Sequence, residues 1–568
     1  MAVVAIGIDD FETIVKEDIF YIDKTEFIKE WWDNKDKVTL ISRPRRFGKT
    51  LNMSMLEAFF SNKYENRADL FEHLNIWKYE EYRKIQGTYP VISLSFANVK
   101  ETTFETAYNK ITEILVKLYS ENDFLLESDV LKPQERAFYQ RVVYKMDITT
   151  ASLALHNMSD YLSRYYGKKV IILLDEYDTP MQEAYVNGYW EEFTSFIRSM
   201  FNAAFKTNPY LERAVMTGIT RVSKESIFSD LNNLEVVTVT SEKYETAFGL
   251  TEEEVFSAMD GMGLTDKAGV KFWYDGFVFG NTADIYNPWS IINYLDKKKF
   301  TTYWANTSSN SLVGRLIRES GAKTKKLFET LLKGNTIDVP VDEQIVYKNL
   351  DTSEGAIWSL MLATGYLKVT QYQTGEEYTG NQYAVYRLAL TNEEVRKMFY
   401  RMVSDWFGEA EGDYNDFIEA MLADDLDAMN EYMESVTLQI FSNFDTGKKV
   451  GKSEPERFYH GFVLGLMVDM SEKYIVKSNR ESGFGRYDIM IYPKDSSKNE
   501  NVRRDAIIIE FKVKNKGKET DLEQTVKAAL KQIDDRNYEA ELIALGFKKE
   551  NIRKYGFAFE GKKVLIGK

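Results

Sequence analysis

The sequence lacks cysteine and has only three histidines and nine prolines in 568 residues. The absence of cysteine excludes disulfide scaffolds, thiolate zinc sites and cysteine nucleophiles. The histidines, His73, His156 and His460, are scattered, which argues against a histidine metal cluster. Any metal is therefore expected to be a hard cation held by carboxylates, which means Mg²⁺ or Mn²⁺.

Long hydrophobic runs are also missing. The first residues, MAVVAIGIDD, lack the basic start and apolar run of a signal peptide. No apolar stretch approaches the roughly 20 residues of a membrane span. We therefore expect a cytoplasmic protein that does not enter a membrane.

Acidic residues outnumber basic ones, and the formal net charge is -15. The excess is uneven: residues 451–568 hold 24 Lys+Arg and 19 Asp+Glu, whereas the rest of the chain is strongly acidic. A basic end on an acidic body is compatible with binding to nucleic acid, and equally with an ordinary surface. The length predicts three or four domains.

A β-rich run at residues 38–41 leads into a basic loop and an amphipathic helix at residues 51–60. A strand, a loop and a helix N-terminus form an anion site, because backbone N–H groups and the helix dipole favour negative charge. Lys49 is expected to reach the β- and γ-phosphates of ATP, and Thr50 to ligate Mg²⁺. The candidate nucleotide-binding loop comprises Arg43, Pro44, Arg45, Arg46, Phe47, Gly48, Lys49 and Thr50. Arg43 stands where such loops usually have glycine, and the alternative is a basic turn that caps a helix.

Two carboxylates, Asp175 and Glu176, follow the continuous apolar run of residues 170–174. Such a run is typical of a parallel strand buried on both faces, whose C-terminal end faces ligands. Asp175 is expected to support Mg²⁺, and Glu176 to polarise the attacking water. The alternative is a solvated acidic turn.

A further apolar run at residues 213–217 ends in polar residues. Thr217 is a candidate to contact the γ-phosphate. Arg221 is a candidate cationic stabiliser, acting in its own chain or in a neighbouring subunit of a homo-oligomer. A surface role for Arg221 is equally compatible with the sequence.

Strands and helices alternate through the first 240 residues. Strands are expected at 38–42, 91–96, 170–174, 213–217 and 235–240, and helices at 51–60, 103–120, 150–166 and 190–206. The alternation predicts an α/β fold with a parallel sheet, in which the phosphate loop follows the first strand and the acidic pair the third.

Seven blocks in this part of the chain carry a family resemblance. They are IGIDDF, YIDKTEFI, RPRRFGKTL, LLDEYD, TGITRVSKESIFSDLNNL, WYDGF and YNPWS. Together they resemble the AAA-ATPase-like family over about residues 5–295, including the unusual arginine-rich loop. The resemblance implies ATP binding, and it leaves the use of the energy open.

The middle of the chain divides into three expected parts. Residues 244–330 look mostly helical, with Thr251 as an N-cap, and are expected to form a lid. Residues 354–404 predict helix, hairpin and helix, a winged-helix-like module whose last helix begins with a Thr391–Glu394 capping box. DNA readout, a spacer role and protein contact all remain open for this module. The acidic residues 405–445 predict a solvated helical connector.

A second chemical cluster lies near the end of the sequence. Glu510 and Lys512 are two apart on a predicted strand, so they share one face, and Asp488 precedes another short strand. Two carboxylates with Mg²⁺ or Mn²⁺ and a lysine suit phosphodiester hydrolysis. A salt-bridged strand in a small α/β domain is the alternative.

The blocks SNRESGFGRYDIMI, IIIEFKV and LKQIDDRNY resemble the PD-(D/E)XK nuclease superfamily over about residues 450–568. The resemblance implies a catalytic core of Asp488, Glu510 and Lys512, with Gln532 and Tyr538 in support. Glu456 fits the assisting glutamate of the first helix, and also fits a capping box with Ser453.

These observations predict an α/β multidomain chain with four parts: an ATPase core at 1–243, a helical lid at 244–335, a winged-helix-like part with its connector at 336–445, and a restriction-endonuclease-like α/β domain at 446–568. The leading hypothesis is an ATP-binding and ATP-hydrolysing protein whose Mg²⁺-dependent nuclease domain acts on DNA, favoured over RNA, in defence or mobile-element control. The alternatives are a nucleotide-dependent sensor or scaffold that binds nucleic acid without cutting, and an ATPase that remodels a partner.

Overall fold

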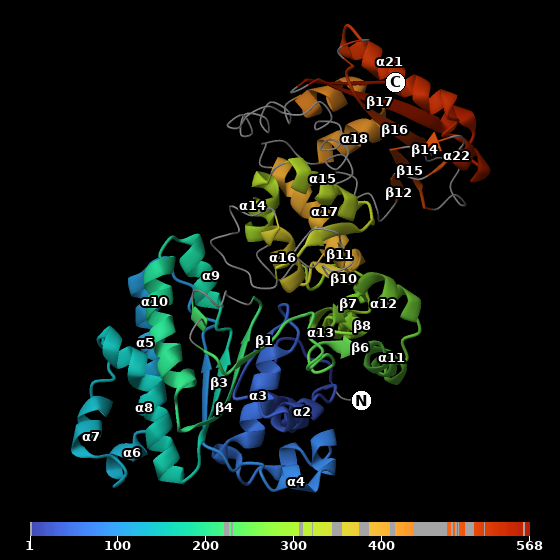
Figure 1. Ribbon diagram of the computed structural model, residues 1–568. Helices are drawn as coiled ribbons and strands as arrows, with labels where there is room; N and C mark the ends of the chain where they lie inside the picture. The colour runs from blue at the N-terminus through green and yellow to red at the C-terminus, as the bar shows by residue number, and fades with distance from the viewer. Residues whose placement is uncertain are drawn as a thin grey trace. The chain divides into compact units, whose positions relative to one another are not determined.

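The computed structural model describes residues 3–568 apart from 221–226, 229–230, 306–310, 321, 343–354, 374–384, 409–414, 435–473, 479–480, 483–484, 487, 495–504, 516, 518 and 561–562. The chain forms two compact units (Figure 1). The first comprises residues 1–309 and 338–394, and the second residues 310–337 and 395–568. The helices of residues 311–332, which the sequence placed in the lid, thus belong to the second unit. The α/β multidomain fold is confirmed.

The first unit is built on a five-stranded parallel sheet of order β2-β3-β4-β1-β5. Its strands are β1 (Val38–Ser42), β2 (Val91–Ser95), β3 (Val170–Asp175), β4 (Leu211–Gly218) and β5 (Leu234–Val237). The first four begin and end within two residues of their predicted positions, and β5 ends three residues before its predicted end at residue 240. β1 and β3 are buried along their whole length, as expected of central parallel strands.

Helices cover both faces of this sheet (Figure 1). They are α1 (Phe11–Lys16), α2 (Glu26–Asn34), α3 (Lys49–Phe60), α4 (Glu80–Arg83), α5 (Phe104–Ser120), α6 (Phe124–Glu127), α7 (Pro133–Tyr139), α8 (Ile148–Tyr166), α9 (Thr179–Val186) and α10 (Trp190–Phe201), with short helical turns at Asn62–Tyr64, Ala68–Leu70, Asn75–Lys78 and Asn202–Lys206. Ile171 and Leu173 pack with α2 and α3 in one aromatic-rich core. Because side chains alternate along a strand, Ile172 and Leu174 face the α8 and α10 side.

The lid contains β6 (Leu250–Thr251), α11 (Glu252–Gly261), α12 (Lys267–Tyr274), β7 (Phe277–Phe279), β8 (Thr282–Tyr286) and α13 (Pro288–Lys297). Its small antiparallel sheet, β6-β8-β7, was not expected, because strands of two to five residues leave little periodicity. The predicted N-cap is confirmed: the Thr251 side chain accepts from the Glu254 backbone N–H, and Glu254 completes a capping box.

The winged-helix-like segment has the expected order of helix, hairpin and helix. It consists of α16 (Ala356–Ala363), β10 (Leu367–Gln373), β11 (Val385–Leu390) and the start of α17 (Glu393–Gly408), and β9 (Ile337–Pro340) adds a third strand beside β11. The side chains of the expected capping box have other partners. Thr391 Oγ1 donates to the Gly365 carbonyl, and the Glu394 carboxylate accepts from Ser290 Oγ at 2.8 Å and the Trp304 backbone N–H at 2.7 Å.

The second unit holds a five-stranded mixed sheet of order β12-β15-β16-β17-β18. Its elements are α14 (Ser311–Glu319), α15 (Ala322–Leu332), α17 after Glu394, α18 (Asn415–Ala423), β12 (Tyr474–Ser478), β13 (Glu481–Ser482), β14 (Gly485–Arg486), β15 (Ile489–Pro493), β16 (Ala506–Val513), α21 (Leu522–Asp535), α22 (Ala540–Ala544), a turn at Lys549–Asn551, β17 (Ile552–Glu560) and β18 (Lys563–Gly567). The expected solvated connector is wrong for α18. Phe417 and Met421 are fully buried, and the Phe417 ring lies 6.4 Å from that of Phe557.

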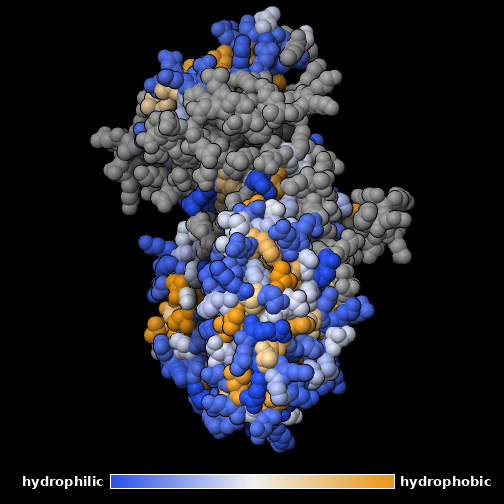
Figure 2. All heavy atoms as spheres, turned by 90° about the vertical axis from the view of Figure 1, so that its left-hand side faces the viewer, coloured by the Kyte–Doolittle hydropathy of each residue, from blue (hydrophilic) through white to orange (hydrophobic). Residues whose placement is uncertain are grey.

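The surface of the first unit seen in Figure 2 is mostly hydrophilic, with hydrophobic side chains in separate groups. No helix among the described residues is long and apolar enough to cross a membrane.

Glu394 makes the stability of the first unit depend on pH. Burial raises the pKa of its carboxyl from 4.5 to about 7. The unfolded chain therefore loses this proton first as pH rises, and the free energy of unfolding should fall between pH 4.5 and 7 by up to about 3 kcal/mol. Glu394→Gln should flatten this slope, as measured by urea unfolding of the full chain at pH 5 and pH 8.

Glu393→Gln is the matched control, since it removes the neighbouring, less buried carboxylate. It should retain the wild-type slope. An unchanged slope in Glu394→Gln would contradict a neutral buried carboxyl.

Candidate functional site

The phosphate loop connects the buried strand β1 to the twelve-residue helix α3. Gly48 is the N-cap of α3, with φ of 77°, and Arg46 also has a positive φ of 63°. Residues in the left-handed region of φ and ψ turn the backbone sharply, and glycine adopts this conformation without strain. The N-terminus of α3 thereby offers its free N–H groups and positive dipole end at the loop, as an anion site requires.

Arg43 occupies the position of the missing first glycine, and its side chain points into the protein. The guanidinium is fully buried and donates to the backbone carbonyls of Ser42, Thr238, Lys243 and Tyr244. This differs from its expected place against the nucleotide. Side-chain contact with phosphate is unavailable to Arg43 here, and any contribution to binding comes from its backbone.

The rest of the loop is held on its outer side by the lid and by the winged-helix-like segment. The Arg45 carbonyl accepts from the Trp304 indole at 3.0 Å and from Asn287 Nδ2 at 3.3 Å. The Arg46 guanidinium lies 4.2 Å from the centre of the Trp289 ring. Pro44 packs against Gly365, where an added Cβ would come within 2.8 Å of Pro44 Cγ, and Phe47 packs against Phe277 and Phe279.

Lys49 is 5 % exposed and points back at the loop. Its ammonium donates to the carbonyls of Arg43 at 3.0 Å and Pro44 at 2.8 Å. Burial lowers the pKa of Lys49, while the charges of Glu176 and Asp175 oppose that shift. The Lys49 ammonium thus lies within the loop, where it could donate to phosphate oxygens in place of these two carbonyls.

Asp175, at the end of β3, connects the start of α3 to the end of β4, which are positions that the sequence singled out. Thr50 Oγ1 donates to Asp175 Oδ2 at 2.7 Å, and Thr217 Oγ1 donates to Asp175 Oδ1. The strand order explains the convergence, because β4 lies between β1 and β3 and ends at the same edge. Burial raises the pKa of Asp175, and the two hydroxyl donors act against the shift. Hydroxyl and carboxylate oxygens at this spacing fit Mg²⁺ as a ligand set.

Glu176 extends from this edge with an uncommon backbone conformation. Its φ is 49°, and its carboxylate Oε2 accepts from Thr179 Oγ1 at 3.1 Å. A non-glycine residue in the left-handed region costs energy and persists only where the surroundings fix it. The half-buried carboxylate remains within reach of solvent, as activation of a water requires.

The cluster of the second unit forms where β15 and β16 lie antiparallel. Ile489 pairs with Ile509, which brings Asp488 beside the neighbouring strand, and Asp488 Oδ2 accepts from the Phe511 N–H at 2.9 Å. Gln532, on α21, connects the other two predicted residues. Its Nε2 donates to Glu510 Oε1, and its Oε1 accepts from Lys512 Nζ at 2.6 Å.

Tyr538 completes this second cluster, since its hydroxyl lies 3.2 Å from Gln532 Nε2. The structure thus brings together Asp488, Glu510, Lys512, Gln532 and Tyr538. Two carboxylates from adjacent strands suit a divalent cation, and a lysine two residues further along the strand suits a developing negative charge. Two other predicted residues, Arg221 and Glu456, lie outside the described residues.

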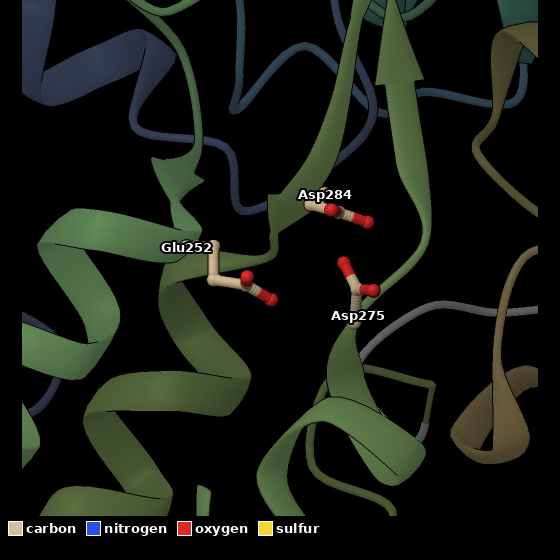
Figure 3. A group of neighbouring side chains, drawn as sticks. All are labelled: Glu252, Asp275 and Asp284. Atoms are coloured by element: carbon tan, nitrogen blue, oxygen red, sulfur yellow. The ribbon is translucent and has the colours of Figure 1, made fainter. Parts of the chain in front are cut away.

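The lid holds an acidic cluster that sequence reasoning missed. Ligand oxygens of Glu252, Asp275 and Asp284 lie within 4.8 Å of one another and face a common space (Figure 3). Burial and the neighbouring Asp284 raise the pKa of Asp275 to about 7. Lys271 Nζ lies 2.5 Å from Glu252, 3.4 Å from Asp284 and 3.9 Å from Asp275. This lysine supplies the neutralising charge, so the cluster is an ion-paired group. Its residues come from three separate elements, which no local spacing could reveal.

Comparison with known proteins finds family matches for the N-terminal and the C-terminal part of the chain. Residues 5–228 match the family model of predicted AAA-ATPases, and residues 454–568 match that of the PD-(D/E)XK nuclease superfamily. The chain carries an AAA-ATPase-like domain and a PD-(D/E)XK nuclease superfamily domain. Both resemblances are thereby confirmed, and the AAA-ATPase-like match ends at residue 228, before the expected limit of about residue 295. The chain is also 26% identical over 395 residues to an uncharacterized protein in the vnfD 5' region of Azotobacter chroococcum mcd 1, covering 69% of this chain and 68% of that protein.

The two domain matches support a nucleotide-binding and nuclease-like protein. The PD-(D/E)XK match also favours contact with nucleic acid. In the AAA-ATPase-like domain the match covers the phosphate loop, Asp175, Glu176 and Thr217. The PD-(D/E)XK match covers all five residues that meet at β15, β16 and α21.

Gly218 should prove essential to the packing of the AAA-ATPase-like domain. A Cβ added there would lie 2.6 Å from Asp178 Oδ1 and 2.7 Å from Tyr177 Cε1. Gly218→Ala should therefore lower the free energy of unfolding by about 1–3 kcal/mol, as measured by urea unfolding. Gly261→Ala is the control, because an added Cβ there meets nothing within 4 Å. It should be neutral or slightly stabilising.

Proposed function

We propose that the chain is a Mg²⁺-dependent ATPase joined to a Mg²⁺- or Mn²⁺-dependent nuclease acting on DNA or RNA, with DNA the preferred substrate. The observation that carries the proposal is the convergence of Thr50 and Thr217 on the buried Asp175, beside Lys49 and Glu176. The cluster of Asp488, Glu510, Lys512 and Gln532 supports the second activity.

In the proposed ATPase reaction, the α3 N-terminus and Lys49 hold the phosphates. Thr50 and Asp175 would hold Mg²⁺, which neutralises phosphate charge when it is bound. Glu176 orients and polarises the attacking water, and Thr217, whose hydroxyl donates to Asp175, would contact the γ-phosphate. Arg221 stays a candidate for stabilising the transferred phosphoryl group, three residues beyond the end of β4.

In the proposed nuclease reaction, Asp488 and Glu510 would hold the divalent cation, which supplies charge neutralisation and a more acidic water when it is bound. Lys512 stabilises negative charge on the scissile phosphate. Gln532 fixes the side chains of Glu510 and Lys512 relative to each other through its amide. Glu456 is proposed to assist. A role in defence or in mobile-element control would follow from ATP-regulated cutting.

Variants of the phosphate site should separate nucleotide binding from hydrolysis. Lys49→Ala should weaken ATP binding about 100-fold, equal to about 3 kcal/mol, because it removes the phosphate cation. Glu176→Gln should bind ATP normally and lose hydrolysis by a factor of about 100–1000. Binding of a fluorescent ATP analogue and phosphate release measure the two effects. Normal ATP binding by Lys49→Ala would refute the phosphate-loop assignment.

The nuclease proposal is tested with Mg²⁺ or Mn²⁺, with and without ATP, on linear, plasmid and single-stranded DNA and on RNA. Lys512→Ala should reduce cleavage about 100–1000-fold while the fold is kept. Lys514→Ala is a matched control, because Lys514 is paired with Glu560 at 2.9 Å. Unchanged cleavage by Lys512→Ala would contradict the nuclease proposal. Metal binding without cleavage of any substrate would favour a sensor or scaffold that binds nucleic acid without cutting.

A further inference from the structure

Asp178 follows the acidic pair by two residues and has no assigned role. It occupies the N-cap position of α9, yet its side chain makes no capping hydrogen bond to that helix. The side chain is only 4 % exposed and turns toward the end of β4. A buried carboxylate that does not cap its own helix is expected to accept hydrogen bonds from other donors.

These donors all belong to the loop that follows β4. Asp178 Oδ2 accepts from the backbone N–H of Ile219 at 2.9 Å, from that of Thr220 at 2.8 Å and from Thr220 Oγ1 at 2.9 Å. Three donors on one oxygen attach the loop at three points, so the position of this acceptor fixes the backbone of Ile219 and Thr220.

The neighbour of Asp178 strengthens the same connection. The Tyr177 backbone N–H donates to the Thr217 carbonyl at 3.0 Å, and the Tyr177 hydroxyl donates to the Thr220 carbonyl at 2.8 Å. Gly218 allows this approach, since any larger residue would collide with Asp178. The segments 175–178 and 217–220 are thus joined at both ends, by Asp175 with Thr217 and by Asp178 with Thr220.

Glu176 lies between these two attachments. Its left-handed backbone, with φ of 49°, is fixed on one side by Asp175 and on the other by Tyr177 and Asp178. Loss of the Asp178 attachment would allow the backbone from Thr217 to Thr220 to move, and the direction of the Glu176 carboxylate would no longer be fixed.

We infer that Asp178 is a positioning residue for ATP hydrolysis, which holds Glu176 and Thr217 in their places by anchoring the loop after β4. The inference rests on the proposed ATPase function. Asp178 acts through the loop, and nucleotide binding at Lys49 does not require it.

The test compares Asp178→Ala with Asp178→Asn in the full chain. Alanine removes all three acceptor bonds, so kcat should fall about 10–100-fold with KM and affinity for a fluorescent ATP analogue within about 3-fold. Asparagine keeps an acceptor oxygen at the same place and should restore kcat to within about 3-fold of wild type. Amide hydrogen exchange at Ile219 and Thr220 should quicken in Asp178→Ala and stay slow in Asp178→Asn.

Asp123→Ala is the matched control, because Asp123 is an exposed N-cap residue that also makes no capping bond. Its kcat should equal that of wild type. Where Asp178→Ala fails to fold, Thr220→Val and Thr220→Ser replace it, since only serine keeps the hydroxyl donor. Thr220→Val should then lower kcat more than Thr220→Ser.

The outcomes separate this inference from the proposed function. If wild-type protein hydrolyses no ATP, the proposed function fails, and slow exchange at Ile219 and Thr220 that is unaffected by Asp178→Ala then overturns the anchor as well. If wild type is active and Asp178→Ala has wild-type kcat, the positioning role alone is overturned. An equal loss of kcat in the alanine and asparagine variants would also overturn it, since the acceptor geometry would then not matter.

Discussion

The first unit depends on a buried cation, the guanidinium of Arg43. It sits over the Phe279 ring at 4.6 Å and donates to carbonyls from the end of β1, the end of β5 and the start of the lid. Burial lowers the pKa of Arg43 to about 9, while Glu245 and Glu30 oppose the shift. Removing a buried cation from such partners is expected to cost several kcal/mol, because the carbonyls would be left without donors. An arginine in place of glycine thus gives the loop an internal anchor.

The same loop also makes contacts on the side away from the Arg43 guanidinium. Pro44, Arg45 and Phe47 contact the lid and the winged-helix-like segment, and Glu394 ties that segment to Trp304, whose indole bonds to Arg45. Displacement of the loop would therefore break contacts with the sheet core, with the lid and with the winged-helix-like segment. The loop is therefore in direct contact both with the lid and with Gly365 of the winged-helix-like segment.

Sequence reasoning found most of what is carried by local pattern. The five strands, the phosphate loop, Asp175 and the cluster around Glu510 each follow from a run of apolar residues and the polar residues at its end. It missed what tertiary contacts decide. The direction of the Arg43 side chain, the partners of Glu394 and the burial of Phe417 depend on residues 90 or more positions away. The acidic cluster of the lid and the contacts of Asp178 join residues that are closer in the sequence but lie on separate elements, so no local spacing marks them.

The connections of α18 and of the residues that follow it have a consequence for the order of folding. Asp424 accepts from the Tyr555 hydroxyl, 131 residues away, and Asn430 exchanges hydrogen bonds with Ile566 across 136 residues. Contacts across such distances close late, since the chain must first lose the entropy of a long loop. During synthesis, α18 leaves the ribosome well before β17 and β18 exist. Until then the apolar side chain of Phe417 lacks its partner on β17. We expect misassembly of the second unit to be most frequent in this interval.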